Sequence, residues 1–314
     1  MNQETTEIQK TDILSRIRLL GRKIGGTPLL KLRESSSNPE VEIWAKAEWN
    51  QLSGSVKARA AYYIVREAIE SGKLNSGNTL LDASSGNTAI AYAYLAHELG
   101  IPLTICLPEN ASSRRKEILK SLGTTLIYTS RFGGTDEAQE VAQELADSQP
   151  ERYFYANQYK NLNNVKAHYE GTAVEIIQAL PQLTHFVAGL GTTGTFTGTA
   201  SRLLEYNSNI SVVALQPDLA LHGLEGWKHL ETAKIPEIFN SSLAQNTLAI
   251  STEKAYAQIN ETFQKENLLL SPSAAANLAG ARELAQQLDR GKIVTIFPDS
   301  SDRYPELIEQ HKNL

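Results

Sequence analysis

The chain has 314 residues, 30 of them basic and 35 acidic, and a formal net charge of −5 at pH 7. This length suits about two domains with a large core. The interspersed charges exclude an obvious nucleic-acid or membrane surface, and no apolar run approaches the roughly 20 residues of a membrane span. The six histidines are scattered, and none of their spacings is that of a metal site.

The single cysteine, Cys106, lies in the apolar run Leu103–Leu107. This setting predicts an inert thiol in the core rather than a reactive one. Because an internal disulfide needs a second cysteine, the composition favours a reducing compartment, and we expect a cytoplasmic protein.

Strand-like and helix-like segments alternate along the chain. The sequence predicts a loose tail at residues 1–10, a turn into an extended segment at Gly25–Leu30 and a surface loop at Ser35–Pro39. The predicted strands are 41–47, 79–83, 103–107, 124–128, 184–188, 212–215 and 292–297, and the predicted helices are 13–20, 58–70, 89–99, 112–122, 136–146, 163–180, 200–206, 252–266 and 273–288. This alternation predicts an α/β fold with parallel sheets covered by helices on both faces.

Three polar turns join a strand to a helix, at 53–57, 84–88 and 189–198. In sheets of this kind, binding sites form where strands end and helices begin. We therefore expect these three turns to carry the chemistry.

The turn Gly189–Gly198 reads Gly-Leu-Gly-Thr-Thr-Gly-Thr-Phe-Thr-Gly. Its backbone N–H groups, its threonine hydroxyls and the following helix dipole predict a cup for a phosphate. A glycine turn that only packs is the alternative. A second alternative is the dinucleotide site of an NAD(P)-dependent oxidoreductase, but such a site requires an acidic residue about 20 positions further along the chain. Here Gln216 and Pro217 stand at that place, and Asp218 comes late.

Lys57 stands at the start of a predicted helix, after the small residues Ser53, Gly54 and Ser55. An ammonium group there opposes the helix dipole, so the position favours the neutral amine. A neutral amine is a nucleophile and can form a Schiff base. A solvated surface lysine is the plainer interpretation. Together with a phosphate cup, an imine-forming lysine is what pyridoxal phosphate requires.

The turn Ser84-Ser85-Gly86-Asn87-Thr88 precedes another predicted helix. Its donors suit a carboxylate, such as that of an amino-acid substrate. A helix N-cap by Ser85 or Asn87 is the alternative, although one such residue is enough for a cap.

Five motifs occur in order along the chain: Gly26-Thr27-Pro28-Leu29, Ser53-Gly54-Ser55-Val56-Lys57, Ser85-Gly86-Asn87-Thr88, Gly191-Thr192-Thr193-Gly194-Thr195 and Pro298-Asp299-Ser300. With them the chain resembles the pyridoxal-phosphate enzymes of the cysteine synthase family, which have the tryptophan-synthase-β fold (fold type II). The stretches 184–195 and 235–240 are most similar to the bacterial B-type enzymes. The resemblance implies a large phosphate-binding domain, 1–50 and 160–314, and a smaller mobile domain, 51–159, that binds the substrate carboxylate.

The resemblance also implies a role for single residues. Lys57 would hold the cofactor and move the substrate α-proton. The other implied cofactor ligands are Asn87 at the ring hydroxyl, Gly191, Thr192, Thr193, Gly194 and Thr195 at the phosphate, and Ser271 at the pyridine nitrogen. For Ser271, a helix N-cap before Pro272 is an alternative that is compatible with this role. The implied ligands of the substrate carboxylate are Ser84, Ser85, Gly86 and Thr88, aided by Gln158.

The expected reaction is β-replacement on an O-activated L-serine, O-acetylserine or O-phosphoserine, by a sulfur nucleophile to give L-cysteine. Synthesis of a 2,3-diaminopropionate-type product and serine or threonine dehydration are alternatives within the same fold, and a catalytically silent partner protein is a third class. In O-phosphoserine-using relatives an arginine meets the substrate phosphate, and Lys228 takes its place here; a solvated loop lysine is the alternative. The chain ends at Leu314, without the longer tail of relatives that use a carrier protein, which favours a small sulfur donor. A homodimer is implied as well.

Overall fold

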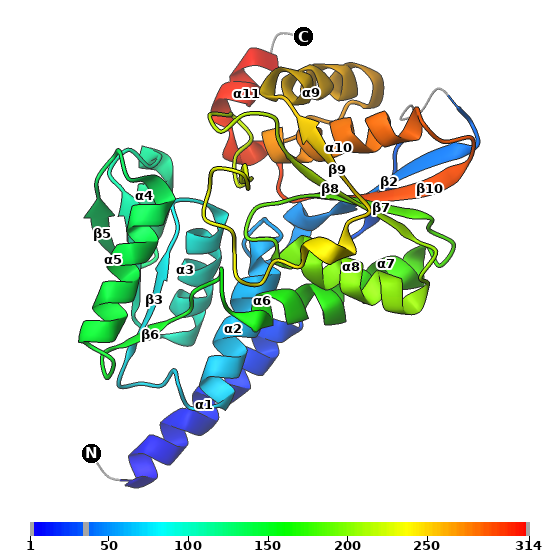
Figure 1. Cartoon of the computed structure of the whole chain (residues 1–314). Helices are drawn as coiled ribbons and strands as arrows, with labels where there is room; N and C mark the ends of the chain where they lie inside the picture. Colours follow the sequence, from blue (N-terminus) through cyan, green and yellow to red (C-terminus); the bar gives the residue numbers. More distant parts are fainter. Residues whose placement is uncertain (1–2, 34–37, 312–314) are drawn as a thin grey trace. The chain divides into compact units, whose positions relative to one another are not determined.

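The structure, a computed structural model, describes residues 3–33 and 38–311 (Figure 1). It divides into two compact units. Unit 1 consists of Met1–Gly25 and Lys57–Asn164, and unit 2 of Gly26–Val56 and Val165–Leu314. Helix α1 (Gln3–Gly21) contacts α2 and α3, so residues 1–25 group with unit 1, whereas the expected domains group them with the larger part.

Unit 2 is built on a six-stranded sheet of order β1-β2-β10-β7-β8-β9. Its strands are β1 (Leu29–Lys31), β2 (Val41–Ala47), β7 (His185–Gly189), β8 (Ser211–Pro217), β9 (Asn246–Ile250) and β10 (Gly291–Phe297). Strand β1 pairs antiparallel with β2, and the other neighbours are parallel. The predicted parallel arrangement is therefore confirmed, with one antiparallel edge strand added to it.

Both faces of this sheet are covered, which explains the apolar runs 186–188 and 212–215 in its strands β7 and β8. Helices α9 (Thr252–Glu266) and α10 (Pro272–Ala285) cover one face, and α7 (Ala173–Ala179) and α8 (Gly194–Tyr206) cover the other (Figure 1). Alternate residues of a strand face opposite ways. Thus Val187 packs in the cluster with α9 and α10, whereas Phe186 and Ala188 pack in the cluster with α7 and α8.

Unit 1 contains a four-stranded parallel sheet of order β5-β4-β3-β6. Its strands are β3 (Thr79–Ala83), β4 (Leu103–Pro108), β5 (Thr125–Thr129) and β6 (Tyr153–Tyr155), and its further helices are α2 (Lys57–Glu70), α3 (Asn87–Leu99), α4 (Ser113–Ser121) and α5 (Gly134–Ser148). Cys106 of β4 is fully buried and packs in one cluster with Ala138 and Ala142 of α5. Burial and, after it, the charge of Asp82 raise the pKa of the Cys106 thiol to about 12, which confirms the predicted inert thiol.

The structure corrects several expectations. Residues 3–10 are part of α1 rather than a loose tail, because this segment is rich in helix-forming glutamine, glutamate and lysine. The predicted helix 163–180 consists of α6 (Leu162–Ala167), a π-helix (His168–Thr172) and α7. The short strands β6 and β9 were not predicted. Most of the loop Ser35–Pro39 lies outside the described residues.

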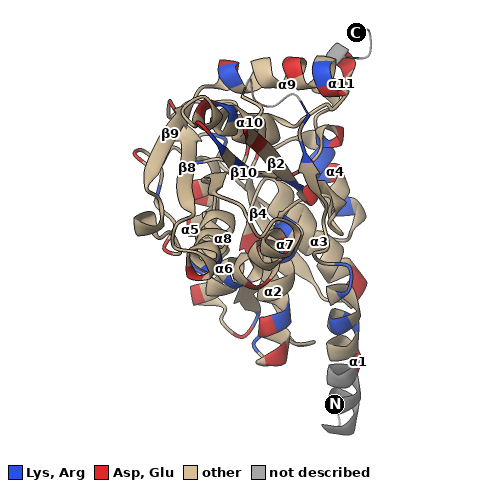
Figure 2. Cartoon of the chain, turned by 90° about the vertical axis from the view of Figure 1, so that its right-hand side faces the viewer, with Lys and Arg blue, Asp and Glu red and all other residues tan. Residues whose placement is uncertain are grey.

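The remaining elements are helix α11 (Pro305–His311) and the 3₁₀ turns η1 (Glu48–Asn50), η3 (Ser241–Leu243) and η4 (Ser301–Arg303). Acidic and basic side chains alternate along the surface helix α9 (Figure 2). Among the described helices, none combines the length and the apolar character that crossing a membrane requires.

Candidate functional site

The turn between β7 and α8 has the backbone of an anion cup. Helix α8 begins at Gly194, and its N-cap, Thr193, adopts a left-handed conformation with φ 69°. The hydroxyls of Thr193 and Thr197 are buried and have no hydrogen-bond partner within the described part of the chain. A helix N-terminus with unused donors beside it attracts a negatively charged group.

A second loop, which contains Gly226, Trp227 and Lys228, packs closely against this turn. A Cβ atom at Gly191 would lie 2.1 Å from the carbonyl oxygen of Gly226, and one at Gly189 would lie 2.1 Å from the ring of Trp227. The N–H group of Lys228 donates to the carbonyl of Leu190 at 2.7 Å. The glycines are therefore required for packing, and Lys228, which is half-buried, has its backbone directly beside the turn.

Two polar side chains hold the turn at its ends. The N–H group of Gly189 donates to Oδ1 of Asn277 on α10 at 2.9 Å. The ring of His168 contacts the Thr195 hydroxyl through Nε2 at 3.2 Å and the Thr172 hydroxyl through Nδ1 at 2.9 Å. His168 opens the π-helix, a rare conformation that often marks functional regions.

The segment leading to Lys57 is tied to residues 298–300. The N–H group of Val56 donates to the carbonyl of Pro298 at 2.8 Å. Ser55 forms an antiparallel bridge with Asp299, and Leu270 forms one with Ser300. One short segment therefore joins the approach to Lys57, the first residue of α2, to the approach to Ser271.

Ser271 is fully buried at the N-cap of α10. Its Oγ atom accepts from the N–H group of Ala274 at 3.3 Å and donates to the carbonyl of Asp299 at 3.2 Å. The predicted N-cap role is thus confirmed. The carboxylate of Asp299 in turn accepts from Ser273 at 3.3 Å and from Tyr304 at 3.1 Å.

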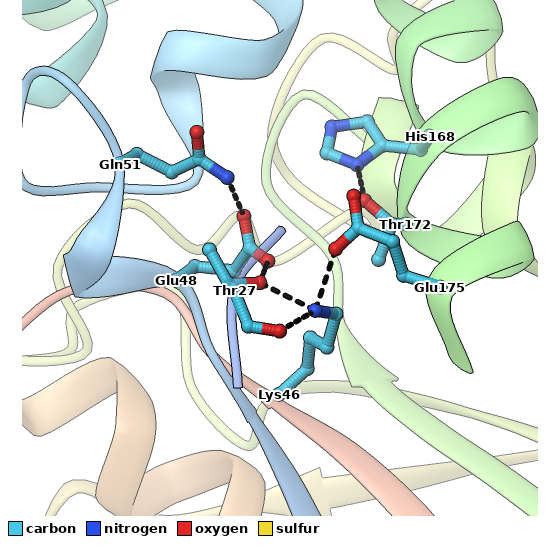
Figure 3. A network of polar contacts seen from close by, with 7 residues as sticks. All are labelled: Thr27, Lys46, Glu48, Gln51, His168, Thr172 and Glu175. Atoms are coloured by element: carbon cyan, nitrogen blue, oxygen red, sulfur yellow. Dashed lines mark hydrogen bonds and ion pairs between the residues drawn. The ribbon is translucent and has the colours of Figure 1, made fainter. Parts of the chain in front are cut away.

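A buried ionic network supports the start of the lysine loop (Figure 3). Lys46 is 1% exposed; its Nζ atom contacts the carbonyl and hydroxyl of Thr27 and forms an ion pair with Glu175 at 2.6 Å. Glu48 accepts from the Thr27 hydroxyl at 2.7 Å and from Gln51 Nε2 at 3.1 Å. Buried charges persist when they are paired and hydrogen-bonded in this way, so the network fixes Gln51, where the loop begins.

In unit 1 the turn 84–88 joins β3 to α3. The Ser84 hydroxyl accepts from the N–H groups of Gly86 and Ala89, both at 3.3 Å. Thr88 donates to Oε1 of Gln158 at 2.8 Å, and Gln158 Nε2 donates to the carbonyl of Ala83 at 3.4 Å. The structure therefore brings Thr88 and Gln158 together, although they are distant in sequence.

The expected site residues thus form two groups. Unit 2 holds Gly191, Thr192, Thr193, Gly194, Thr195, Lys228 and Ser271, and unit 1 holds Lys57, Ser84, Ser85, Gly86, Asn87, Thr88 and Gln158. The sequence interpretation missed Asn277 and His168, and it quoted Asp299 only as part of the motif Pro298-Asp299-Ser300, without a role. Asn277 left a signal, because it is a lone polar residue within the alanine-rich stretch 274–281.

The chain is similar to known proteins over most of its length. A family model described as "Pyridoxal-phosphate dependent enzyme" matches residues 20–299. A "Cysteine synthase" of Aquifex aeolicus is 41% identical over 90% of this chain and 88% of that protein. "Cysteine synthase B" of Escherichia coli is 34% identical over 91% of this chain and 93% of that protein. The crystal structure of an "O-acetylserine dependent cystathionine beta-synthase" from Helicobacter pylori has a TM-score of 0.85 at 32% identity, over 91% of this chain and 96% of that one.

Proposed function

The chain belongs to the family of pyridoxal-phosphate dependent enzymes, and on this premise we propose that it is a cysteine synthase. It replaces the activated hydroxyl group of an O-substituted L-serine by a sulfur nucleophile and so makes L-cysteine. The observation that carries the proposal is the phosphate cup of 191–195 in a chain that is 41% identical to a cysteine synthase over 90% of its length. The cofactor of the family is pyridoxal 5′-phosphate.

The residues present fit this cofactor. The buried, unused hydroxyls of Thr193 and Thr197 in the described chain, the N-terminus of α8 and the closely packed Gly191 are what a phosphate group needs. We assign the phosphate to Gly191–Thr195. Asn87 is assigned to the ring hydroxyl, and Ser271 to the pyridine nitrogen, to which its hydroxyl would donate in place of the Asp299 carbonyl. When bound, the cofactor withdraws electrons from the substrate α-carbon.

Lys57 carries two tasks in this proposal. Its Nζ atom would hold the cofactor covalently, and the same amine would take the proton from the α-carbon of the bound substrate. The bond from the β-carbon to the leaving-group oxygen then breaks. A thiolate adds its sulfur to the β-carbon, and Lys57 returns the proton to the α-carbon. Substrate and sulfide thereby give cysteine and the free acid.

The turn 84–88 is assigned to the substrate carboxylate. The backbone donors at the start of α3, the Ser85 hydroxyl and the second Nε2 hydrogen of Gln158 offer hydrogen bonds to two carboxylate oxygens, and Thr88, whose hydroxyl donates to Gln158 Oε1, orients that amide. The Thr88–Gln158 hydrogen bond of 2.8 Å supports a shared task for these two residues. Ser84 contributes by fixing the turn, since its hydroxyl accepts from two N–H groups of this segment.

The leaving group is proposed to be acetate, and phosphate is accepted through Lys228. The backbone bond between Lys228 and Leu190 holds the backbone of this residue beside the phosphate cup, and the proposal directs its ammonium group to the substrate phosphate. A lysine attracts a phosphate as a point charge without the fork of an arginine.

We expect Lys228→Ala to lose activity with O-phosphoserine selectively. A hydrogen bond to a charged group contributes about 1.5–3 kcal/mol, so kcat/KM for this ester should fall by roughly tenfold or more. The value for O-acetylserine should stay near that of the wild type. Steady-state rates of cysteine formation with sulfide measure both.

Lys234→Ala, an exposed lysine of the same loop, is the matched control and should change neither rate. Equal losses on both esters in Lys228→Ala, or no loss on either, would show that Lys228 does not read the leaving group.

A homodimer, a cytoplasmic location and a mobile smaller domain complete the proposal and stay predictions. The family resemblance supports the homodimer and the mobile domain, and a chain with one buried cysteine is compatible with a reducing compartment. Sedimentation of the purified holoenzyme distinguishes a dimer from a monomer.

A further inference from the structure

The carboxyl group of Asp82 is buried beneath the turn 84–88. Asp82 lies near the end of β3, two positions before Ser84, and is 0% exposed. Within the described chain, neither carboxyl oxygen of Asp82 has a hydrogen-bond partner at a good distance and angle. The buried hydroxyl of Tyr92 has none there either. Buried polar atoms without partners are costly and rare, so this carboxyl group calls for an explanation.

The groups that face Asp82 belong to segments that adjoin the proposed carboxylate site. They are the backbone N–H groups of Ala83, Asn157 and Gln158 and the hydroxyl of Tyr92. Asn157 has φ 45°, a left-handed conformation that is unusual outside glycine. A left-handed residue can turn successive N–H groups to one side, which makes a concavity for an anion.

This concavity is connected to Gln158 and through it to Thr88. Two of the N–H groups that line the concavity are those of Asn157 and of Gln158 itself. The side chain of Gln158 accepts a hydrogen bond from Thr88 at 2.8 Å and donates one to the carbonyl of Ala83 at 3.4 Å. The other backbone group of Gln158, its carbonyl, accepts from Asn164 at 2.8 Å. The Gln158 side chain therefore depends on how its backbone is held.

We propose that Asp82 is a positioning residue for the substrate-carboxylate site: its ionised carboxylate attracts the N–H groups of Asn157 and Gln158 and so holds the Gln158 side chain against Thr88. This inference rests on the proposed function, because it assigns Gln158 and Thr88 to the substrate. Because Asp82 is fully buried, it acts on the substrate only through Gln158.

The charge of Asp82 changes near neutral pH. Burial raises the pKa of its carboxyl group to about 7, against the smaller opposite effect of the facing N–H and hydroxyl groups. The titratable side chains that face it in the described unit 1 are Tyr92 on α3, Cys106 on β4, Tyr155 on β6 and Tyr159, with Asp136 of α5 near Tyr159. Burial raises the pKa of Tyr92, Cys106, Tyr155 and Tyr159 as well, so these four groups stay neutral while Asp82 ionises.

The sign of the effect on stability follows from this pKa. The value rises from 3.8 to about 7 on folding, so the folded state binds the proton more tightly. The contribution to stability is complete below pH 4 and is lost as pH rises through about 7. At pH 8 the ionised Asp82 thus destabilises the protein, and a carboxylate retained at such a site is a candidate for function.

The test is the pH dependence of amino-acid binding. L-serine is titrated into the holoenzyme between pH 6 and pH 8.5, and binding is followed by the change in cofactor absorption. The wild type should bind about tenfold more tightly above the midpoint near pH 7 than below it. Asp82→Asn should bind weakly at every pH, with KM for O-acetylserine raised much more than kcat is lowered.

Two further variants keep the test decisive if Asp82→Asn does not fold. Tyr92→Phe removes a donor to the ionised carboxylate and should move the midpoint to higher pH. Tyr155→Phe removes a neutral hydroxyl that only faces Asp82, and this variant should leave the midpoint unchanged. In a Gln158→Ala background, Asp82→Asn or Tyr92→Phe should have no further effect on binding.

An unchanged midpoint in Tyr92→Phe, or full additivity with Gln158→Ala, overturns the Asp82 proposal alone. A wild-type holoenzyme that binds no L-serine at any pH contradicts the proposed function and this proposal together.

Discussion

The Lys57→Ala protein is expected to fold, to bind pyridoxal phosphate only reversibly and to lose β-replacement activity. Lys57 begins α2 directly after Val56, whose N–H group is fixed on the carbonyl of Pro298 at 2.8 Å. The loss follows because the same Nζ atom holds the cofactor and moves the α-proton. A positioned general base alone contributes about 10²–10⁴-fold, so turnover should fall by at least that factor.

The absorption spectrum and peptide mapping measure this effect separately from activity. The wild type should show the visible band of a lysine-bound cofactor, and borohydride reduction should fix the cofactor on the peptide that contains Lys57. Lys73→Ala is the matched control, because Lys73 lies just beyond α2 and pairs with Glu67 on the surface. Labelling of a different lysine would refute the assignment. A wild type without the band would contradict the covalent attachment of the cofactor to Lys57.

The Gly191→Val protein is expected to lose the affinity for pyridoxal phosphate almost entirely. Even the first carbon of a side chain would lie 2.1 Å from the Gly226 carbonyl, and both groups belong to backbone that cannot move aside easily. The turn must then shift, and its N–H groups no longer point toward a single phosphate group. Gly194→Val, at the first position of α8, should likewise weaken binding.

Thr195→Val is the comparison that separates backbone from hydroxyl. One charge-assisted hydrogen bond contributes about 1.5–3 kcal/mol, so this variant should lose about 10–100-fold in affinity. The glycine variants should lose more. Titration of each apoprotein with the cofactor, followed by absorption and by thermal stability, gives the affinities. A glycine variant that keeps wild-type affinity would contradict the phosphate cup.

The periodic elements could be predicted from the sequence because each has a local cause. Strands such as β7 and β8 are continuous apolar runs, as parallel strands buried on both faces must be. The misses are elements without such a pattern. Strand β6 has three residues, and the edge strand β9 has the mostly exposed sequence Asn-Thr-Leu-Ala-Ile. The π-helix at 168–172 arises where α8 packs closely against the preceding helix, α6: a Cβ atom added at Gly198 would lie 2.2 Å from the carbonyl oxygen of Val165. No local sequence pattern reveals this contact.

The candidate site divides in the same way. The residues on the three turns were predicted because glycine, serine and threonine gather there in sequence. The side chains that hold these turns lie far away along the chain. Asn277 is 88 positions from Gly189, and Asp299 is 28 positions from Ser271. Only folding brings such partners together, and their residue types fit many plain structural roles.

Product analysis of the purified holoenzyme tests the central claim most directly. The enzyme is incubated with O-acetyl-L-serine and sulfide, and cysteine, acetate and pyruvate are quantified beside a Lys57→Ala control. The account predicts cysteine and acetate in equal amounts, with neither formed by the control above the uncatalysed rate. Acetate with pyruvate but no cysteine, or no turnover by a protein that carries the cofactor, would contradict it.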